Sequence, residues 1–327
     1  MKTLALIVLL ALAASSPAHA YLKLGALVDG AVVDVTWRGP VRYFISDLGT
    51  SGVSATQLRD AVARAAATWS AVESANVEFT YLGLTSAVPD EIDGRATIGF
   101  MDRPDLEQVL GATSFLIDIT NGDIVEADIF FNTQFQWSVS ATGTPGRVDL
   151  ESVALHELGH LLGLSHSALG EAELQASGNR VVTATGAVMF PIATSSGTIA
   201  ERVLHADDIA GISDLYPTSS AISDTGSIFG RVTKNGQGVL GAHVIAFDPE
   251  RGVLISNFTL NPQGEFVIAR LPPGPYVLRV EPLDDASPDS FFSVPIDANF
   301  RVTYAPRMVV APQGGSSRSI EIQVAPK

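Results

Sequence analysis

The stretch that decides the fold reads ALHELGHLLGLSH and spans residues 154–166. It contains His156, His160 and His166, half of the six histidines in a chain of 327 residues. The apolar residues between them predict a helix, and Gly163 marks its end. On such a helix His156 and His160 are four residues apart, so their rings stack on one face about 6 Å apart.

This spacing predicts a zinc site. A sharp turn at Gly163 would bring His166 back as a third ligand, and three nitrogens with one water form the open tetrahedral site of catalytic zinc. Glu157 is turned about 100° around the helix axis, where it can reach a water without binding the metal. One alternative is a set of ordinary core histidines. Another is a structural zinc, which needs a fourth protein ligand, usually Cys.

Charge and cysteine content limit the classes of partner. The net charge is −15, and residues 21–217 hold 25 acidic and 10 basic side chains, against 10 and 9 in residues 218–327. This acidic balance argues against nucleic acid as a partner, and a solvated acidic surface is the simplest interpretation. The chain has no Cys. Disulfides and a thiolate ligand to the metal are therefore excluded.

Residues 1–20, MKTLALIVLLALAASSPAHA, predict a secretory signal peptide. They combine one Lys, an apolar run and an Ala-x-Ala cleavage site at 18–20. A membrane anchor is the alternative, but the apolar run is too short to span a bilayer. We therefore expect a protein secreted to the periplasm or the extracellular space, with no membrane association after signal removal.

The remaining patterns predict an α+β fold followed by an all-β domain. Before Pro217 we expect a long helix starting at Ser54, a hairpin turning at Asn121-Gly122, and a last helix after His205. Residues 218–226 predict a polar linker. Residues 227–327 contain short β-rich runs separated by Gly and Pro, which predicts an all-β sandwich.

HELGHLLGLSH, together with the following Ser167, resembles the extended zinc motif of the metzincin metalloproteases, and more narrowly that of the matrixins (peptidase M10 type). AVMFP at 187–191 resembles the family's Met-turn, with Met189 beneath the metal. Residues 204–217 are similar to its C-terminal helix. GDIVEADIFFN at 122–132 resembles the edge strand that pairs with substrate. The resemblance covers residues 22–217.

The resemblance implies a catalytic domain at 21–217 with a twisted mixed sheet, and a secreted zinc endopeptidase. One zinc would be bound by His156, His160 and His166, with Glu157 as the general base acting on water. The partner would be a protein or peptide substrate, and we expect a monomer. The alternative is a non-catalytic surface or adhesion protein that only binds metal. Because Glu157 and all three histidines are present, the enzyme is favoured.

Two departures from the family pattern stand out. First, the chain has no Cys, so it cannot be kept inactive by a propeptide cysteine, the cysteine switch of the family. Second, residues 167–188 form an insertion at the position where the family resemblance places the wall of the main specificity pocket. A structural calcium site is a further hypothesis, because hard oxygen ligands gather near the hairpin. Its candidate ligands are Asp118, Asp123, Glu126, Asp128 and Asn132. A solvated acidic hairpin is the alternative.

The C-terminal part carries a second resemblance. GRVTKNGQGVLGAHVIAFD at 230–248 and LPPGPYVLRVEP at 271–282 resemble the carboxypeptidase regulatory-like, transthyretin-like β-sandwich. Such a domain could bind a surface polymer or a protein, or it could be a passive spacer.

Overall fold

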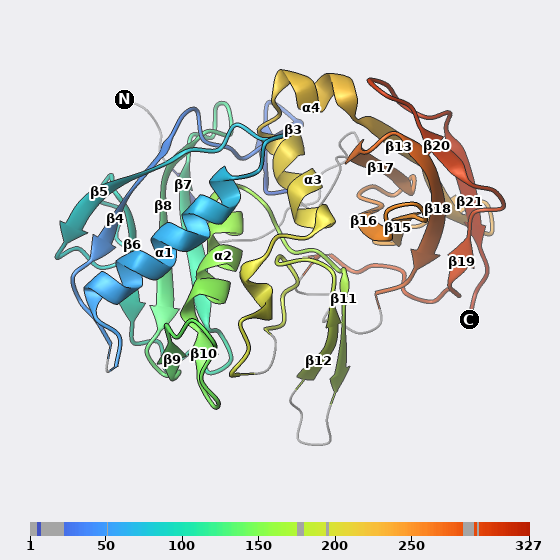
Figure 1. Cartoon of the computed structure of the whole chain (residues 1–327). Coiled ribbons are helices and arrows are strands. Elements are labelled where there is room, and N and C mark those ends of the chain that lie inside the picture. The colour runs from blue at the N-terminus through green and yellow to red at the C-terminus, as the bar shows by residue number, and fades with distance from the viewer. Residues whose placement is uncertain are drawn as a thin grey trace.

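The structure is a computed structural model that describes residues 5–7, 23–50, 52–174, 180–193, 196–283, 291–292 and 294–327. An N-terminal part with helices and a sheet lies beside a second part made of strands, which we call the C-terminal β region (residues 226–327) (Figure 1). The predicted signal peptide lies outside the described residues, except for the short strand β1.

The N-terminal part is built on one six-stranded sheet with the order β1-β7-β8-β6-β4-β5. Its strands are β1 (Ala5–Ile7), β4 (Val41–Ser46), β5 (Phe79–Thr85), β6 (Ala96–Met101), β7 (Gly111–Ile117) and β8 (Ile124–Asn132). The neighbours β5, β4, β6 and β8 run parallel, whereas β7 is antiparallel to β8 and β1 is antiparallel to β7. This mixed sheet agrees with the predicted α+β class.

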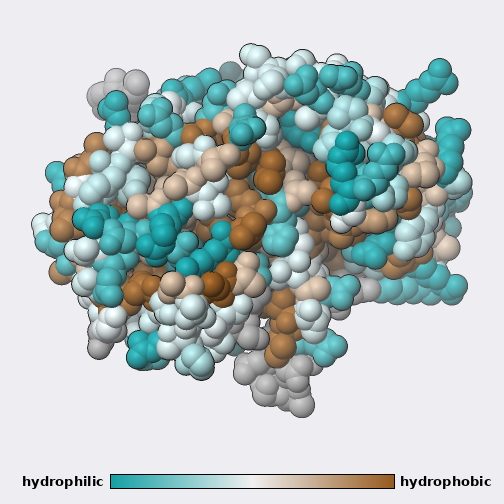
Figure 2. Space-filling model, in the orientation of Figure 1, coloured by the Kyte–Doolittle hydropathy of each residue, from teal (hydrophilic) through white to brown (hydrophobic). Residues whose placement is uncertain are grey.

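Two helices, α1 (Ala55–Ser70) and α2 (Leu150–Leu161), lie on the same face of this sheet (Figure 1). As predicted, α1 starts after Ser54, whose side chain accepts the N–H of Gln57 in a capping box. The inward face of α1 is apolar and joins the core, while its outward face is hydrophilic (Figure 2). The helix pair therefore covers the sheet as the amphipathic pattern predicts.

The predicted hairpin forms between β7 and β8, but two expectations about it are wrong. The connection runs from 118 to 123 instead of turning in two residues, because the Asp118 carbonyl accepts the N–H groups of Asn121 and Gly122. In addition, β8 is not an edge strand. It lies between β6 and β7, and both β7 and β8 contact α2.

The other elements of this part are shorter. They are β2 (Gly25–Val28), β3 (Ala31–Asp34), β9 (Trp137–Ser138), β10 (Val148–Asp149), β11 (Gly170–Leu174), β12 (Arg180–Thr185), the 3-10 helix η1 (Ala200–Arg202), α3 (Ala206–Leu215) and α4 (Ser219–Asp224). α4 falls within the segment predicted as a linker. In the described part of the chain, no helix has the length and apolar character needed to cross a membrane.

The C-terminal β region consists of two sheets around one core. The first holds β13 (Gly226–Lys234), β14 (Gln237–Gly238), β17 (Glu265–Leu271) and β21 (Ile320–Val324). The second holds β15 (His243–Asp248), β16 (Val253–Phe258), β18 (Gly274–Glu281), β19 (Thr303–Tyr304) and β20 (Val309–Ala311). Ile228 and Phe266 of the first sheet share a buried cluster with Val244 and Leu278 of the second. This arrangement is compatible with the predicted sandwich, and its transthyretin-like assignment stays a prediction.

Candidate metal centre

Helix α2 is anchored before the predicted metal-site residues begin. Asp149 caps the helix, because its carboxylate accepts the backbone N–H of Ser152 at 3.0 Å. Arg202 of η1 donates to the same carboxylate at 2.8 Å. The fully buried Trp69 of α1 donates its ring N–H to the Leu155 carbonyl at 2.9 Å. α2 is thus fixed at its start and along the side that faces α1.

The C-terminal turn of α2 depends on glycine. Gly163 has a φ of +99°. Its N–H donates to the His160 carbonyl at 2.7 Å, and the N–H of Leu164 donates to the Gly159 carbonyl at 3.0 Å, the two bonds of a Schellman motif. A Cβ at this position would lie 2.2 Å from the carbonyl oxygen of Val35. The glycine therefore permits both the left-handed conformation and the close approach that turns the chain.

We expect Gly163→Ala to lower the free energy of unfolding by about 2–4 kcal/mol, because overpacking against Val35 adds to the left-handed strain. Gly30→Ala is the matched control, since Gly30 has a φ of +84° and nothing within 4 Å of an added Cβ. That control should lose only about 1–2 kcal/mol. Urea unfolding with a chelator present measures both variants. Equal losses would show that the contact with Val35 is unimportant.

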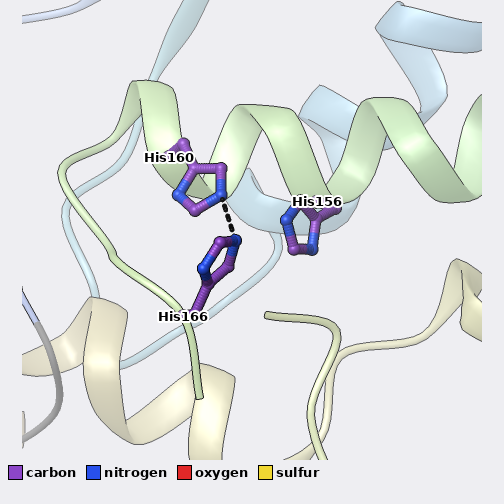
Figure 3. Close-up of side chains that lie close together, drawn as sticks. All are labelled: His156, His160 and His166. Atoms are coloured by element: carbon purple, nitrogen blue, oxygen red, sulfur yellow. Dashed lines mark hydrogen bonds between the residues drawn. The ribbon is translucent and has the colours of Figure 1, made fainter. Parts of the chain in front are cut away.

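The three predicted ligands converge (Figure 3). Each of them offers a nitrogen, and these nitrogens lie within 4.8 Å of one another, the one such cluster found among the described residues. Nε2 of His160 and Nε2 of His166 are 3.2 Å apart, and the His156 ring centroid is 4.7 Å from that of His160. Two nitrogens at 2.0–2.1 Å from one tetrahedral zinc are about 3.3 Å apart. The spacing of the His160 and His166 nitrogens therefore fits a zinc ion, and a nitrogen of His156 lies within 4.8 Å of them.

Backbone carbonyls fix the tautomers of the two helical histidines. Nδ1 of His156 lies 2.8 Å from the Val188 oxygen, and Nδ1 of His160 lies 2.9 Å from the Leu164 oxygen. Because a carbonyl only accepts, each Nδ1 carries the proton and each Nε2 presents its lone pair. Burial, with the nearby His166, lowers the pKa of His156 to about 4, and burial likewise lowers the pKa of His160. The rings are thus neutral, which is the form that binds metal.

Glu157 lies between α2 and β7. Its side chain is only 4% exposed, and burial raises its pKa to about 7. Thr113 of β7 donates its hydroxyl to Oε2 of Glu157 at 2.8 Å, and this bond acts in the opposite direction on the pKa. No hydrogen bond to Oε1 is found among the described residues. A buried carboxylate with one oxygen fixed and one open is suited to exchange a proton with water.

Met189 lies against α2 between the two helical ligands. A Cβ at Gly159 would be 2.3 Å from the Met189 sulfur, so the two are in direct contact. The N–H groups of Val188 and Met189 donate to the Asp208 carboxylate at 2.9 and 3.1 Å. The N–H of Ser167 donates to the Met189 carbonyl at 2.9 Å. Met189 thus packs against the ligand helix, and its place beneath the metal stays a prediction.

The carboxylates considered for calcium do not gather around one point. Asp128 accepts the N–H groups of Thr97 and Asp90, both at 2.7 Å, and Glu126 accepts that of Gly94 at 2.8 Å. These bonds tie the loop before β6 to β8. The other candidate ligands make hydrogen bonds elsewhere: Asp118, Asp123 and Asn132. Among the described residues they form no metal-type cluster, and calcium binding stays a prediction.

Thr113 is a residue of this site that the sequence did not reveal. It contacts Glu157 across 44 positions of sequence, and one threonine within a predicted strand carries no special signal. The alternation of β7 could have placed it on the helix-facing side, but only once the strand next to α2 was known.

Comparison with known proteins agrees with this geometry. The profile of the family described as Matrixin (Peptidase_M10) matches residues 36–217. The chain is 36% identical over 103 residues to stromelysin-1 of Mus musculus, which covers 32% of this chain and 18% of that protein. It is 30% identical over 198 residues to the hatching enzyme of Paracentrotus lividus (58% and 28%), and 29% identical over 182 residues to metalloendoproteinase 2-MMP of Arabidopsis thaliana (52% and 40%).

The match therefore spans well under half the length of each of these curated relatives. The family profile includes the ligand helix, the turn at Met189 and α3. Because the family profile covers more than half of the sequence and includes all three histidines, this chain belongs to the matrixin family.

Proposed function

We propose that this chain is a secreted zinc-dependent endopeptidase that uses Glu157 as its general base. The observation that carries the proposal is the convergence of three histidines, with a buried glutamate one residue after the first of them. The curated relatives support the reaction class through their names, which include metalloendoproteinase 2-MMP and hatching enzyme.

Each group of the site has its own role in the proposed reaction. Zinc held by His156, His160 and His166 would supply Lewis-acid chemistry, acidifying a water and polarising a carbonyl oxygen. Glu157 would accept the proton of the attacking water at Oε1 and return it to the leaving amine. Thr113 would hold the carboxylate in place through Oε2. Removal of the signal peptide would remove β1, which leaves β7 free to pair with an extended peptide.

The other parts of the proposal rest on sequence patterns. We place the signal peptide at 1–20, the catalytic domain at 21–217, the linker at 218–226 and a carboxypeptidase regulatory-like sandwich at 227–327. We propose one zinc per chain, a protein or peptide substrate, a monomer, and an extracellular or periplasmic location. Neither nucleic acid nor, after signal removal, a membrane belongs to the proposed partners.

A peptide library incubated with the purified chain, with and without a chelator, tests the function. We expect cuts within peptides that stop when the chelator is added and return when zinc is restored. If no peptide is cut with zinc supplied, the proposed activity is wrong. The alternative of a metal-binding surface protein would then be favoured.

The hydrogen bond from Thr113 to Glu157 leads to a prediction about how kcat/KM depends on pH. Glu157 must be ionised to act as a base, so kcat/KM should rise with pH through the pKa of this group. Burial raises that pKa to about 7, and a bound cation would lower it. The acid limb of the pH profile, where kcat/KM rises with pH, should therefore lie at or below about pH 7. The hydrogen bond from Thr113 favours the carboxylate. Thr113→Val should therefore move the limb to higher pH, and an unchanged or lower limb would contradict the assignment.

A further inference from the structure

The segment that follows the third histidine rests on the C-terminal β region. Leu169 and Ala187, near the two ends of the 167–188 insertion, form one buried cluster with Ile245 of β15. Ala168 packs against a second cluster that belongs to the C-terminal β region: Phe258, Leu283, Phe291 and Phe292. The β11–β12 hairpin extends from the junction between the two parts (Figure 1). The insertion is therefore held at its base by residues outside the matrixin match.

A buried carboxylate joins the same segment to β16. The Ser167 hydroxyl donates to Oδ2 of Asp207 at 2.6 Å, and the backbone N–H of Ser256 donates to Oδ1 at 2.7 Å. Asp207 is only 3% exposed. Hydrogen bonds to a buried carboxylate are short and strong, so this bridge fixes the residue next to His166 relative to the C-terminal β region.

The C-terminal β region also contacts His166, the third predicted zinc ligand. The Phe291 ring lies edge-on to the His166 ring, with centroids 6.3 Å apart and an interplanar angle of 76°. Phe291 and Phe292 both contact Phe258, at 5.5 and 5.3 Å between centroids, and both are buried. Of these two neighbouring phenylalanines, only Phe291 makes a ring contact with His166.

We infer that the C-terminal β region is a positioning element of the metal centre, which holds His166 through Phe291 and through the Asp207 bridge. His156 and His160 lie on a helix anchored within the N-terminal part, whereas His166 lies on a loop. The N-terminal part restrains this loop through the Ser167–Met189 hydrogen bond, and the second part of the chain adds the packing of Ala168, Leu169 and Phe291. The inference rests on the proposed zinc site, and it excludes the passive-spacer interpretation of residues 227–327.

Phe291→Leu and Phe292→Leu in the full chain separate positioning from packing. Both changes remove a ring from the same buried cluster, so both should lower the unfolding midpoint of the chelator-treated protein by similar amounts. Only Phe291→Leu should weaken zinc binding, by about tenfold, as is typical for residues that orient metal ligands. Competition with a fluorescent zinc chelator measures the affinity. Equal zinc affinities in the two variants would overturn the inference.

A second pair of variants tests the hydrogen-bonded bridge through Asp207. In Asp207→Asn the amide can still accept the N–H of Ser256 and donate to the Ser167 hydroxyl, whereas Asp207→Ala loses both bonds. We expect near wild-type zinc affinity for the first and about tenfold weaker binding for the second. Equal affinities in the two Asp207 variants would count against the inference. The wild type is measured first: absent zinc binding contradicts the proposed function as well, whereas normal binding with unaffected variants contradicts only the positioning role.

Discussion

Replacing Glu157 with glutamine is expected to lower peptide cleavage by about 10²–10⁴-fold while leaving zinc affinity unchanged. Glutamine has nearly the same shape, and its carbonyl oxygen can accept the Thr113 hydroxyl that now binds Oε2. It cannot accept a proton from water at neutral pH. The loss should therefore appear in kcat, with the ligand triad intact.

Glu151→Gln is the control for this change. Glu151 lies on the same helix and is also buried, but it binds Arg64 and Arg202 away from the triad. We expect close to wild-type cleavage from it. Steady-state cleavage of one library-derived peptide, with zinc content measured on the same samples, compares the variants. Wild-type turnover in Glu157→Gln would show that another group is the base.

Replacing His166 with alanine is expected to weaken zinc binding by roughly 10²–10³-fold and to abolish cleavage at limiting zinc. Apparent zinc-binding free energies of about 10–16 kcal/mol in four-ligand sites give each ligand a share of about 2.5–4 kcal/mol. His166 lies on a loop, so its loss should disturb the fold less than changes within α2.

His205→Ala is the matched control. His205 lies outside the triad and begins α3 through its backbone N–H, which donates to Asp208 at 2.9 Å and survives the substitution. It should keep wild-type zinc affinity in the chelator competition. An unchanged affinity in His166→Ala would mean that zinc is bound elsewhere.

The sequence predicted the ligand helix well because its signals are local. The spacing of His156 and His160 sets their common face, and Gly163 marks the turn through its conformation alone. Helix α1 was likewise predicted from the helical spacing of its apolar residues and from the cap at Ser54. These features need no knowledge of distant contacts.

What the sequence did not reveal depends on contacts between distant segments. β8 resembled an edge strand, but strand order is set by the whole sheet, which places it between β6 and β7. The hydrogen bond from Thr113 to Glu157 could not be predicted without knowing this strand order. The contact of Phe291 with His166 joins two parts of the chain that were interpreted separately, and no local pattern links them.

A crystal structure of the zinc-loaded chain, with anomalous scattering at the zinc edge, tests the central claim most directly. We expect one zinc peak about 2.0–2.1 Å from a ring nitrogen of each of His156, His160 and His166, with solvent in the fourth position. A fourth side chain on the ion, or a zinc bound away from these rings, would contradict the proposed open site.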